Sequence, residues 1–226
     1  MCRSTSSPST RELAGEVHRD LVGLVTSLAE PEGWAATACA GWCVRDLVAH
    51  LLGGVRHALV ALGTPADGPP DIDAIRYWTP GLLADPSPGA DRRGVRVLAS
   101  LYPRIEQLAT EYADAVAALL HLGAGVAGEA VVRTRGRALR VDDLFHILAV
   151  EATVHHDDLV AHLDRPGPSG PGLTAVRAVL DGLLGSAVPV PWDDVSYLRA
   201  GTGRVPLTAR ERTLLGADAY RFPLLG

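Results

Sequence analysis

The sequence predicts a mainly α-helical protein: one helical bundle followed by a short, irregular carboxy-terminal extension. Apolar residues recur at spacings of three and four, Pro- and Gly-rich stops separate the periodic segments, and strict alternation is confined to residues 130–141. The chain has 226 residues, 47% of them hydrophobic, which is enough for one substantial core. We expect residues 1–185 to form the bundle and residues 186–226 to pack on it as an extension.

The first two periodic segments predict amphipathic helices. Residues 10–30 place leucines and valines on one face. A second helix is expected from near Val44 to a Gly-Thr-Pro stop, with Asp46 in its first turn, where a carboxylate suits the helix dipole. A loop rich in Pro, Gly and Asp then covers residues 64–91, and loops of this length often border functional sites.

The remaining periodicity predicts further helices and one hairpin. A third helix is expected over about 92–122, with Pro103 either kinking it or marking its true start. Residues 130–141, "AVVRTRGRALRV", alternate around Gly136 as a short β-hairpin does. After Gly185 we expect loops with one small helix. The later helices are expected at 142–163, 173–184 and 208–215.

Composition and charge narrow the range of functions. A formal net charge of −5, spread along the chain, argues against nucleic acid or a polybasic membrane surface. No apolar run reaches the roughly 18 residues of a transmembrane helix, and the first ten residues lack the apolar core of a secretion signal. Three cysteines, Cys2, Cys39 and Cys43, argue against a disulfide framework and fit a reducing compartment. We expect a cytoplasmic monomer or homodimer that binds small molecules.

The segment "EATVHHDDLVAH", residues 151–162, places acids and imidazoles among apolar residues of the fourth helix. At 100° per residue the acids and imidazoles of one stripe face the core, while His156 and Asp157 point away. A buried charge is costly unless it is paired, hydrogen-bonded or bound to a metal, so the stripe needs an explanation. Its members are Leu144, Ile147, Leu148, Glu151, His155, Asp158 and His162.

Two interpretations of Glu151 and His155 stay open at this point. Being four residues apart, they lie one helical turn apart and can reach one ion, or they form an ordinary acid–imidazole pair at a partly solvated face. A third donor, His50 at the rim of the apolar stripe of the second helix, favours the ion, because helical bundles build metal sites from inward-facing helical ligands. Two imidazoles and one carboxylate leave coordination positions open, as catalytic zinc sites do.

The other histidines and the cysteines are expected to have structural roles. Cys39 and Cys43 form only a weak CxxxC pattern. We expect His18, His121, His156 and His162 at the surface or its boundary, and His57 and His146 as partners of the metal ligands or, more simply, as satisfied core imidazoles.

Three segments, in order along the chain, share motifs with one known family. They are "CAGWCVRDLVAHLLG" (39–53), "EATVHHDDL" (151–159) and "YLRAGTGRVPLTARERTLLG" (197–216). They resemble the Cys-x-Gly-Trp-Thr-Val-x-Asp-Leu-x-x-His, Glu-x-x-x-His and Thr-Gly-Arg-x-Pro-Leu segments of the mycothiol-dependent maleylpyruvate isomerase family. That family belongs to the DinB/YfiT-like superfamily of metal-binding four-helix bundles. The resemblance implies a DinB-like four-helix bundle with His50, Glu151 and His155 as metal ligands.

The resemblance also implies a chemistry. It implies a divalent metal, with zinc as the default, and mycothiol as a thiol cosubstrate, so that a metal-bound thiolate attacks a small electrophile and gives S-transfer or isomerisation. Asp158 is then expected to orient an imidazole. Arg204 is expected either to anchor a carboxylate or the thiol cofactor through its fork, or to close the extension onto the bundle. Tyr77 and Trp78 are expected to line a pocket, or simply the core.

Two departures from the family pattern leave alternatives open. Cys43 stands where the family has Thr or Ser, and a thiol is a poor acceptor for capping a helix. Either the cap of the second helix is weaker, or Asp46 compensates for it. The roughly forty residues after Gly185 are too few for the second domain of the maleylpyruvate isomerase itself, so its substrate does not transfer. Two other functions remain: a metal-dependent hydrolase or lyase without thiol, and a non-catalytic metal-binding or interaction bundle.

Overall fold

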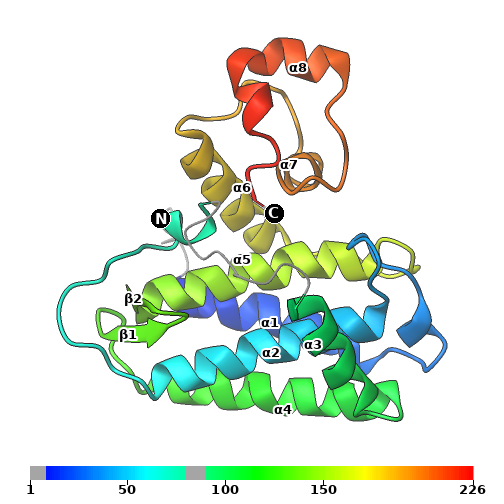
Figure 1. Cartoon of the computed structure of the whole chain (residues 1–226), viewed down its shortest axis with the longest axis vertical. Helices are drawn as coiled ribbons and strands as arrows, with labels where there is room; N and C mark the ends of the chain where they lie inside the picture. Colours follow the sequence, from blue (N-terminus) through cyan, green and yellow to red (C-terminus); the bar gives the residue numbers. More distant parts are fainter. Residues whose placement is uncertain (1–8, 80–89, 226) are drawn as a thin grey trace, which may run out of the picture.

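Four helices surround the main hydrophobic core of the computed structural model, which describes residues 9–79 and 90–225 (Figure 1). Helix α2 packs mainly against α4, and α1 mainly against α5, while contacts between α1 and α4 and between α2 and α5 close the ring. The helices are α1 (Thr10–Thr26), α2 (Val44–Leu62), α4 (Ile105–Ala124) and α5 (Val141–Val160).

The starts of α1 and α2 show two ways of capping a helix. At α1 the Glu12 N–H donates to the Ser9 hydroxyl (3.3 Å), and the Ser9 N–H donates to the Glu12 carboxylate (2.8 Å), which forms a capping box. At α2 the Asp46 N–H is directed at the thiol of Cys43, a weaker acceptor than a hydroxyl, and the Cys43 N–H donates to the Asp46 carboxylate at 3.2 Å. Asp46 therefore accepts the hydrogen bond of the capping box whose donor is the backbone N–H of residue 43, so this bond does not depend on the side chain at that position.

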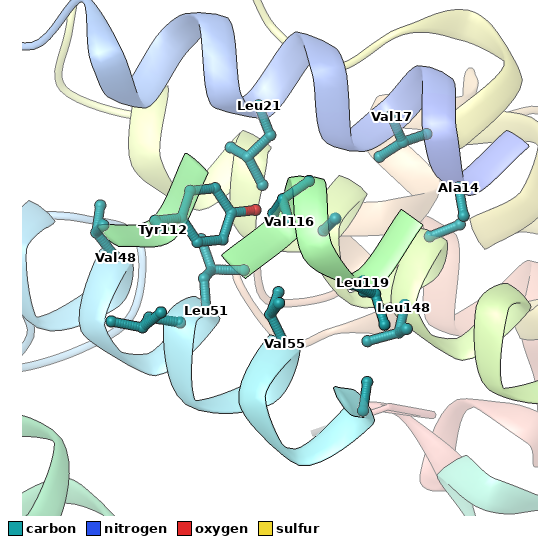
Figure 2. Packing of buried hydrophobic residues seen from close by; sticks show 14 of the residues in the cluster. Ala14, Val17, Leu21, Val48, Leu51, Val55, Tyr112, Val116, Leu119 and Leu148 are labelled. Carbon is teal, nitrogen blue, oxygen red and sulfur yellow. The ribbon is translucent and has the colours of Figure 1, made fainter. Parts of the chain in front are cut away.

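Interdigitating apolar side chains from all four helices fill the bundle (Figure 2). Leu21 of α1 and Leu119 of α4 are fully buried, and Leu51 of α2 is 3% exposed. Burial of one such side chain contributes about 1.5–3 kcal/mol relative to its exposure, so the three- and four-residue spacings predicted from the sequence stabilise the bundle through this face.

Of the two expectations for the third helix over 92–122, a kinked continuous helix is wrong, and a true start at Pro103 agrees with the structure. Two helices occupy this region, α3 (Ala90–Ser100) and α4, separated by residues 101–104. Pro103 has no N–H to donate and its ring excludes a continuous helix, so it marks the break, and α4 starts two residues later. Helix α3 packs against α2.

The predicted hairpin is present as β1 (Val131–Thr134) and β2 (Arg137–Arg140), which pair antiparallel. Two backbone hydrogen bonds attach β1 to the segment after α2: Ala66 N–H to Val131 C=O and Arg133 N–H to Thr64 C=O, both 2.9 Å. The hairpin is therefore fixed to the end of α2 at one end of the bundle (Figure 1).

The carboxy-terminal part is more helical than predicted. A second apolar cluster joins α5 to α6 (Gly170–Leu184) and α7 (Asp194–Gly201), and α7 was not predicted. A helix of eight residues shows too few turns for periodicity to reveal it; the burial of Tyr197 and Leu198 against α6 stabilises it. The other short elements are α8 (Ala209–Leu215), η1 (Glu32–Trp34), η2 (Arg76–Trp78) and η3 (Gly216–Arg221).

This second cluster explains why α5 is buried on more than one face. Figure 1 shows α5 between the bundle and the carboxy-terminal elements. His156 and Asp157, predicted to point away from the core, are 4% and 3% exposed, so that prediction is wrong. His18, expected at the surface or its boundary, is 2% exposed between α1 and α4, whereas His121 is exposed as expected. His162 is also exposed, so its place on the core-facing stripe is wrong, because α5 ends at Val160. Along the described residues, no helix combines the length and apolarity needed to cross a bilayer.

Candidate metal centre

The structure brings together the three side chains expected to bind a metal. His50 comes from α2, and Glu151 and His155 come from successive turns of α5. One donor atom from each lies within 4.8 Å of the other two. His50 Nε2 is 3.4 Å from a Glu151 carboxylate oxygen, and the two imidazole rings are 5.0 Å apart, nearly perpendicular. The packing of α2 against α5 thus turns two distant sequence motifs into one cluster.

Asp158 holds His155 in a defined tautomer. Its Oδ2 lies 2.9 Å from His155 Nδ1, one turn along α5. Burial raises the pKa of Asp158, but hydrogen bonds from His155 and Arg204 outweigh burial and keep that pKa far below its usual range. The carboxylate can then only accept, so Nδ1 of His155 is the protonated nitrogen and Nε2 is the one available to a ligand.

Arg204 completes this chain of contacts from the carboxy-terminal region. Its Nε and Nη2 donate to the two oxygens of Asp158 at 3.0 and 2.8 Å, and its Nη1 donates to the Thr202 carbonyl at 2.8 Å. The fork of Arg204 is therefore occupied by a carboxylate of this chain. Arg204 thus joins the carboxy-terminal region to the bundle next to the candidate centre, and its binding of a carboxylate or of the thiol cofactor stays a prediction.

The electrostatics of the cluster favour a carboxylate at Glu151. Burial raises the pKa of Glu151. The hydrogen bond from His50 and the charges of His50, His155 and Arg135 lower this pKa by more than burial raises it, to about 2. The side chains of His50, Glu151 and His155 are 28%, 20% and 14% exposed, so the cluster is reachable from solvent. The ring of Trp42 packs 5.1 Å from that of His50 and restricts its orientation.

A second group of donors, Cys39, His155 and Asp158, also lies within 4.8 Å. Cys39 donates to Asp158 Oδ2 (3.1 Å) and accepts from Arg204 Nη2 (3.4 Å). Burial and the neighbouring Asp158 raise the pKa of Cys39 to about 12, so Cys39 in this network is a neutral thiol that donates its proton to Asp158. We therefore interpret this group as a hydrogen-bond network that supports His155.

A small pocket adjoins Glu151 in the groove between α2 and α5. The tip of the hairpin and Tyr77 close it. His57 lies there with an exposed side chain, its Nδ1 2.9 Å from the Gly53 carbonyl, so the core interpretation of His57 is wrong. The residues that line the pocket are Gly54, His57, Ala58, Tyr77, Thr134, Arg135, Leu144, Ile147, Leu148 and Glu151.

Trp78 is not among the residues that line this pocket. It packs between the two apolar clusters, with its ring 5.1 Å from that of Tyr77. Its Nε1 is buried and has no hydrogen-bond partner among the residues that the structure describes. Tyr77 therefore faces the pocket, and Trp78 supports Tyr77 from behind.

Sequence reasoning overlooked Trp42 and Arg135. Trp42 lies in the same segment as His50, residues 39–53, which resembles the family motif. This segment could have indicated that Trp42 contacts His50. Arg135 had only the weak signal of an arginine before glycine at a hairpin turn, because the turn predicts a backbone conformation and does not show what the side chain approaches.

The donor set fits a divalent transition metal. Two imidazole nitrogens and one carboxylate oxygen suit zinc, nickel or iron, and a set of three protein donors leaves room for a further ligand. The hydrogen bond that His155 Nδ1 donates to Asp158 is the support that metal-binding imidazoles usually have.

The fold is that of a DinB-like four-helix bundle, and its clustered donors define a candidate metal centre. The family model described as mycothiol maleylpyruvate isomerase N-terminal domain matches residues 14–160, and the chain belongs to this family. A crystal structure of a mutant of the mycothiol-dependent maleylpyruvate isomerase superposes with a TM-score of 0.51 at 16% identity, covering 76% of this chain and 68% of that one. At this identity the likeness shows the fold alone. No curated protein matches the sequence.

Proposed function

We propose that this protein is a metal-dependent thiol S-transferase or isomerase that uses mycothiol and a small electrophile as substrates. The observation that supports the proposal best is the convergence of His50, Glu151 and His155 beside a pocket, in a chain of a family whose name refers to mycothiol. Transfer and isomerisation share this site and differ in the electrophile: an epoxide or a leaving group gives a stable thioether, whereas a conjugated cis double bond isomerises.

Two groups of residues have different roles in the proposed centre: one would bind a divalent cation, and the other positions these ligands. His50, Glu151 and His155 would hold a divalent cation, zinc by default, which when bound lowers the pKa of a thiol and so makes a thiolate available near neutral pH. Asp158 keeps the proton on Nδ1 of His155, and Arg204 keeps Asp158 in place. Both act on the centre by positioning another residue.

The pocket beside Glu151 has a volume of about 20 Å³ and admits one water-sized group, so it is the proposed place for the reacting end of the electrophile only. Leu144, Ile147 and Leu148 give it an apolar wall on α5, and Tyr77 closes it from the loop after α2. An apolar wall excludes water and favours a small organic molecule over a hydrated ion. Because Glu151 belongs both to the cluster and to the pocket wall, a molecule in the pocket would lie next to the thiol.

The test measures metal content and thiol consumption on the same preparation. The protein is purified without chelator, metal per chain is determined by mass spectrometry, and loss of thiol is followed with activated alkenes, epoxides and alkyl halides. We expect one divalent metal per chain and consumption that depends on it. His50→Ala should lose both, while His121→Ala, which changes an exposed histidine of α4, should keep both.

Other outcomes would replace the proposal. Turnover of a substrate without thiol would favour a metal-dependent hydrolase or lyase. Absence of metal together with absence of turnover across the panel would favour a non-catalytic interaction bundle.

A further inference from the structure

Arg135 adopts a backbone conformation that arginine rarely adopts. Thr134 and Arg137 form the last pair of the β1–β2 ladder, so the hairpin turns through Arg135 and Gly136 alone. Both have positive φ, 46° and 76°, as a type I′ turn requires. Asn or Gly is favoured at the first of these positions, because a larger side chain is strained there. Strained residues of this kind concentrate at functional sites.

The side chain of Arg135 lies where a cation can act on a bound molecule. Arg135 lines the pocket together with Glu151 and Tyr77; its charge helps to lower the pKa of Glu151 and opposes the rise that burial causes in the pKa of Tyr77. Within the described residues it makes no hydrogen bond and no ion pair, although Glu151 is in the same pocket wall and is engaged by His50. Among the residues that the structure describes, nothing occupies its planar fork of five donors, which is therefore available to a bound molecule.

From this placement we infer that Arg135 binds an anionic group, a carboxylate in the simplest case, on one of the two substrates. The inference rests on the proposed function and adds a substrate class to it: at least one substrate is an anion whose charged end lies at the hairpin tip while its reacting atom lies toward Glu151.

The variant Arg135→Asn separates this role from folding. Asn suits a positive φ better than Arg, so the variant should melt at the wild-type temperature or above it. Arg133→Gln is the matched control, because it removes the same charge from an exposed position of the same hairpin, outside the pocket. Arg135→Lys keeps the charge but loses the planar fork.

Two pairs of probes identify the substrate that has the anionic group. In the first arm, 3-mercaptopropionate and 3-mercapto-1-propanol are titrated calorimetrically into the zinc-loaded protein. In the second, kcat/KM is measured for thiol addition to acrylate and to acrylamide, each variant being compared with wild type on the same substrate. We expect Arg135→Asn to weaken the carboxylate member of one pair by about tenfold or more, which is typical of a lost charge-assisted hydrogen bond, and to leave its neutral twin unchanged.

The arm that shows this selective loss assigns the anion to the thiol or to the electrophile. Equal effects on the charged and neutral members of both pairs, or the same loss in Arg133→Gln, would overturn the inference and leave the proposed function standing. If neither thiol binds to wild type and neither acceptor reacts, the proposed function fails, and the inference fails with it.

Discussion

Two adjacent carboxylates of α5 form nearly identical ion pairs with the carboxy-terminal region. Asp157 accepts from Nε and Nη2 of Arg199 at 2.9 and 2.8 Å, and Asp158 accepts from the same atoms of Arg204 at 3.0 and 2.8 Å. Both carboxylates are buried. Only Asp158 also contacts His155 and Cys39.

The difference between the two pairs shows what distinguishes a structural ion pair from part of a site. The geometry of the pair is the same, and so is the burial of the acid. What differs is the next contact. Asp158 reaches an imidazole whose other nitrogen is available to a ligand, whereas Asp157 has hydrogen bonds with Arg199 alone among the described residues. We therefore expect both pairs to stabilise the fold and only the Asp158 pair to affect metal binding.

Removal of the negative charge of a metal ligand should have the largest effect on metal binding. It also tests whether the centre that Asp158 supports binds a metal at all. Glu151→Gln keeps the shape of the side chain but replaces a charged donor with a neutral amide. We expect nearly all bound metal to be lost, as measured by metal per chain after dialysis. Glu111→Gln, a surface change on α4, should keep the metal. Full metal occupancy in Glu151→Gln would contradict the candidate centre.

The stability of the two pairs should differ because their arginines differ in exposure. Arg204 is 18% exposed and Arg199 is 43% exposed. Arg204→Met leaves the fully buried Asp158 without its cation and should cost about 3 kcal/mol of unfolding free energy. Arg199→Met should cost roughly 1 kcal/mol, because solvent screens that pair. Denaturant unfolding of the metal-free proteins measures both; equal losses would contradict the comparison.

Metal affinity should separate the two carboxylates directly. Asp158→Asn removes the acceptor that fixes the His155 tautomer, and loss of such support typically weakens metal binding about 10- to 100-fold. Asp157→Asn serves as the control, since it breaks a similar pair without touching His155. Competition with a coloured chelator gives both affinities. A common affinity for the two variants would mean that Asp158 is structural only.

A third buried contact extends the comparison to imidazoles and predicts a pH dependence. His18 contacts Tyr112 OH at 3.3 Å instead of a carboxylate, and its Nε2 has no partner among the described residues. Burial lowers the pKa of His18 to about 4, although the charge of Glu151 raises it slightly. Protonation therefore favours the unfolded chain, and stability should fall as pH drops from the unfolded pKa of 6.5 toward 4.

The size of this effect is set by the two pKa values. Between pH 7 and pH 5 the His18 contribution amounts to about 2 kcal/mol of unfolding free energy. A glutamine at position 18 does not titrate. Between pH 7 and pH 5 the unfolding free energy of wild type, measured with denaturant, should therefore fall by about 2 kcal/mol more than that of His18→Gln. Parallel losses in the two proteins would show that His18 is not the titrating group.

Local patterns allowed much of the fold to be predicted. The alternation around Gly136 gave the hairpin, and the apolar periods gave α1, α2, α5 and α6 to within a few residues at most ends. Periodicity failed at Pro103, where an apolar pattern continues across a break, and at α7, where two turns are too short to establish a period. The exposure of His156 and Asp157 was predicted wrongly because one stripe was assumed to be the only buried face of α5.

The sequence by itself determined which side chains share a helix face, because that depends only on the 3.6-residue period: Glu151, His155 and Asp158 had to lie on successive turns of one helix. Tertiary structure alone decided that His50 meets them, that Arg204 takes Asp158 as its partner, and that Arg135 reaches the pocket wall. Each of these depends on how distant segments pack, which is set by the summed burial of many apolar side chains and leaves no local periodic signal.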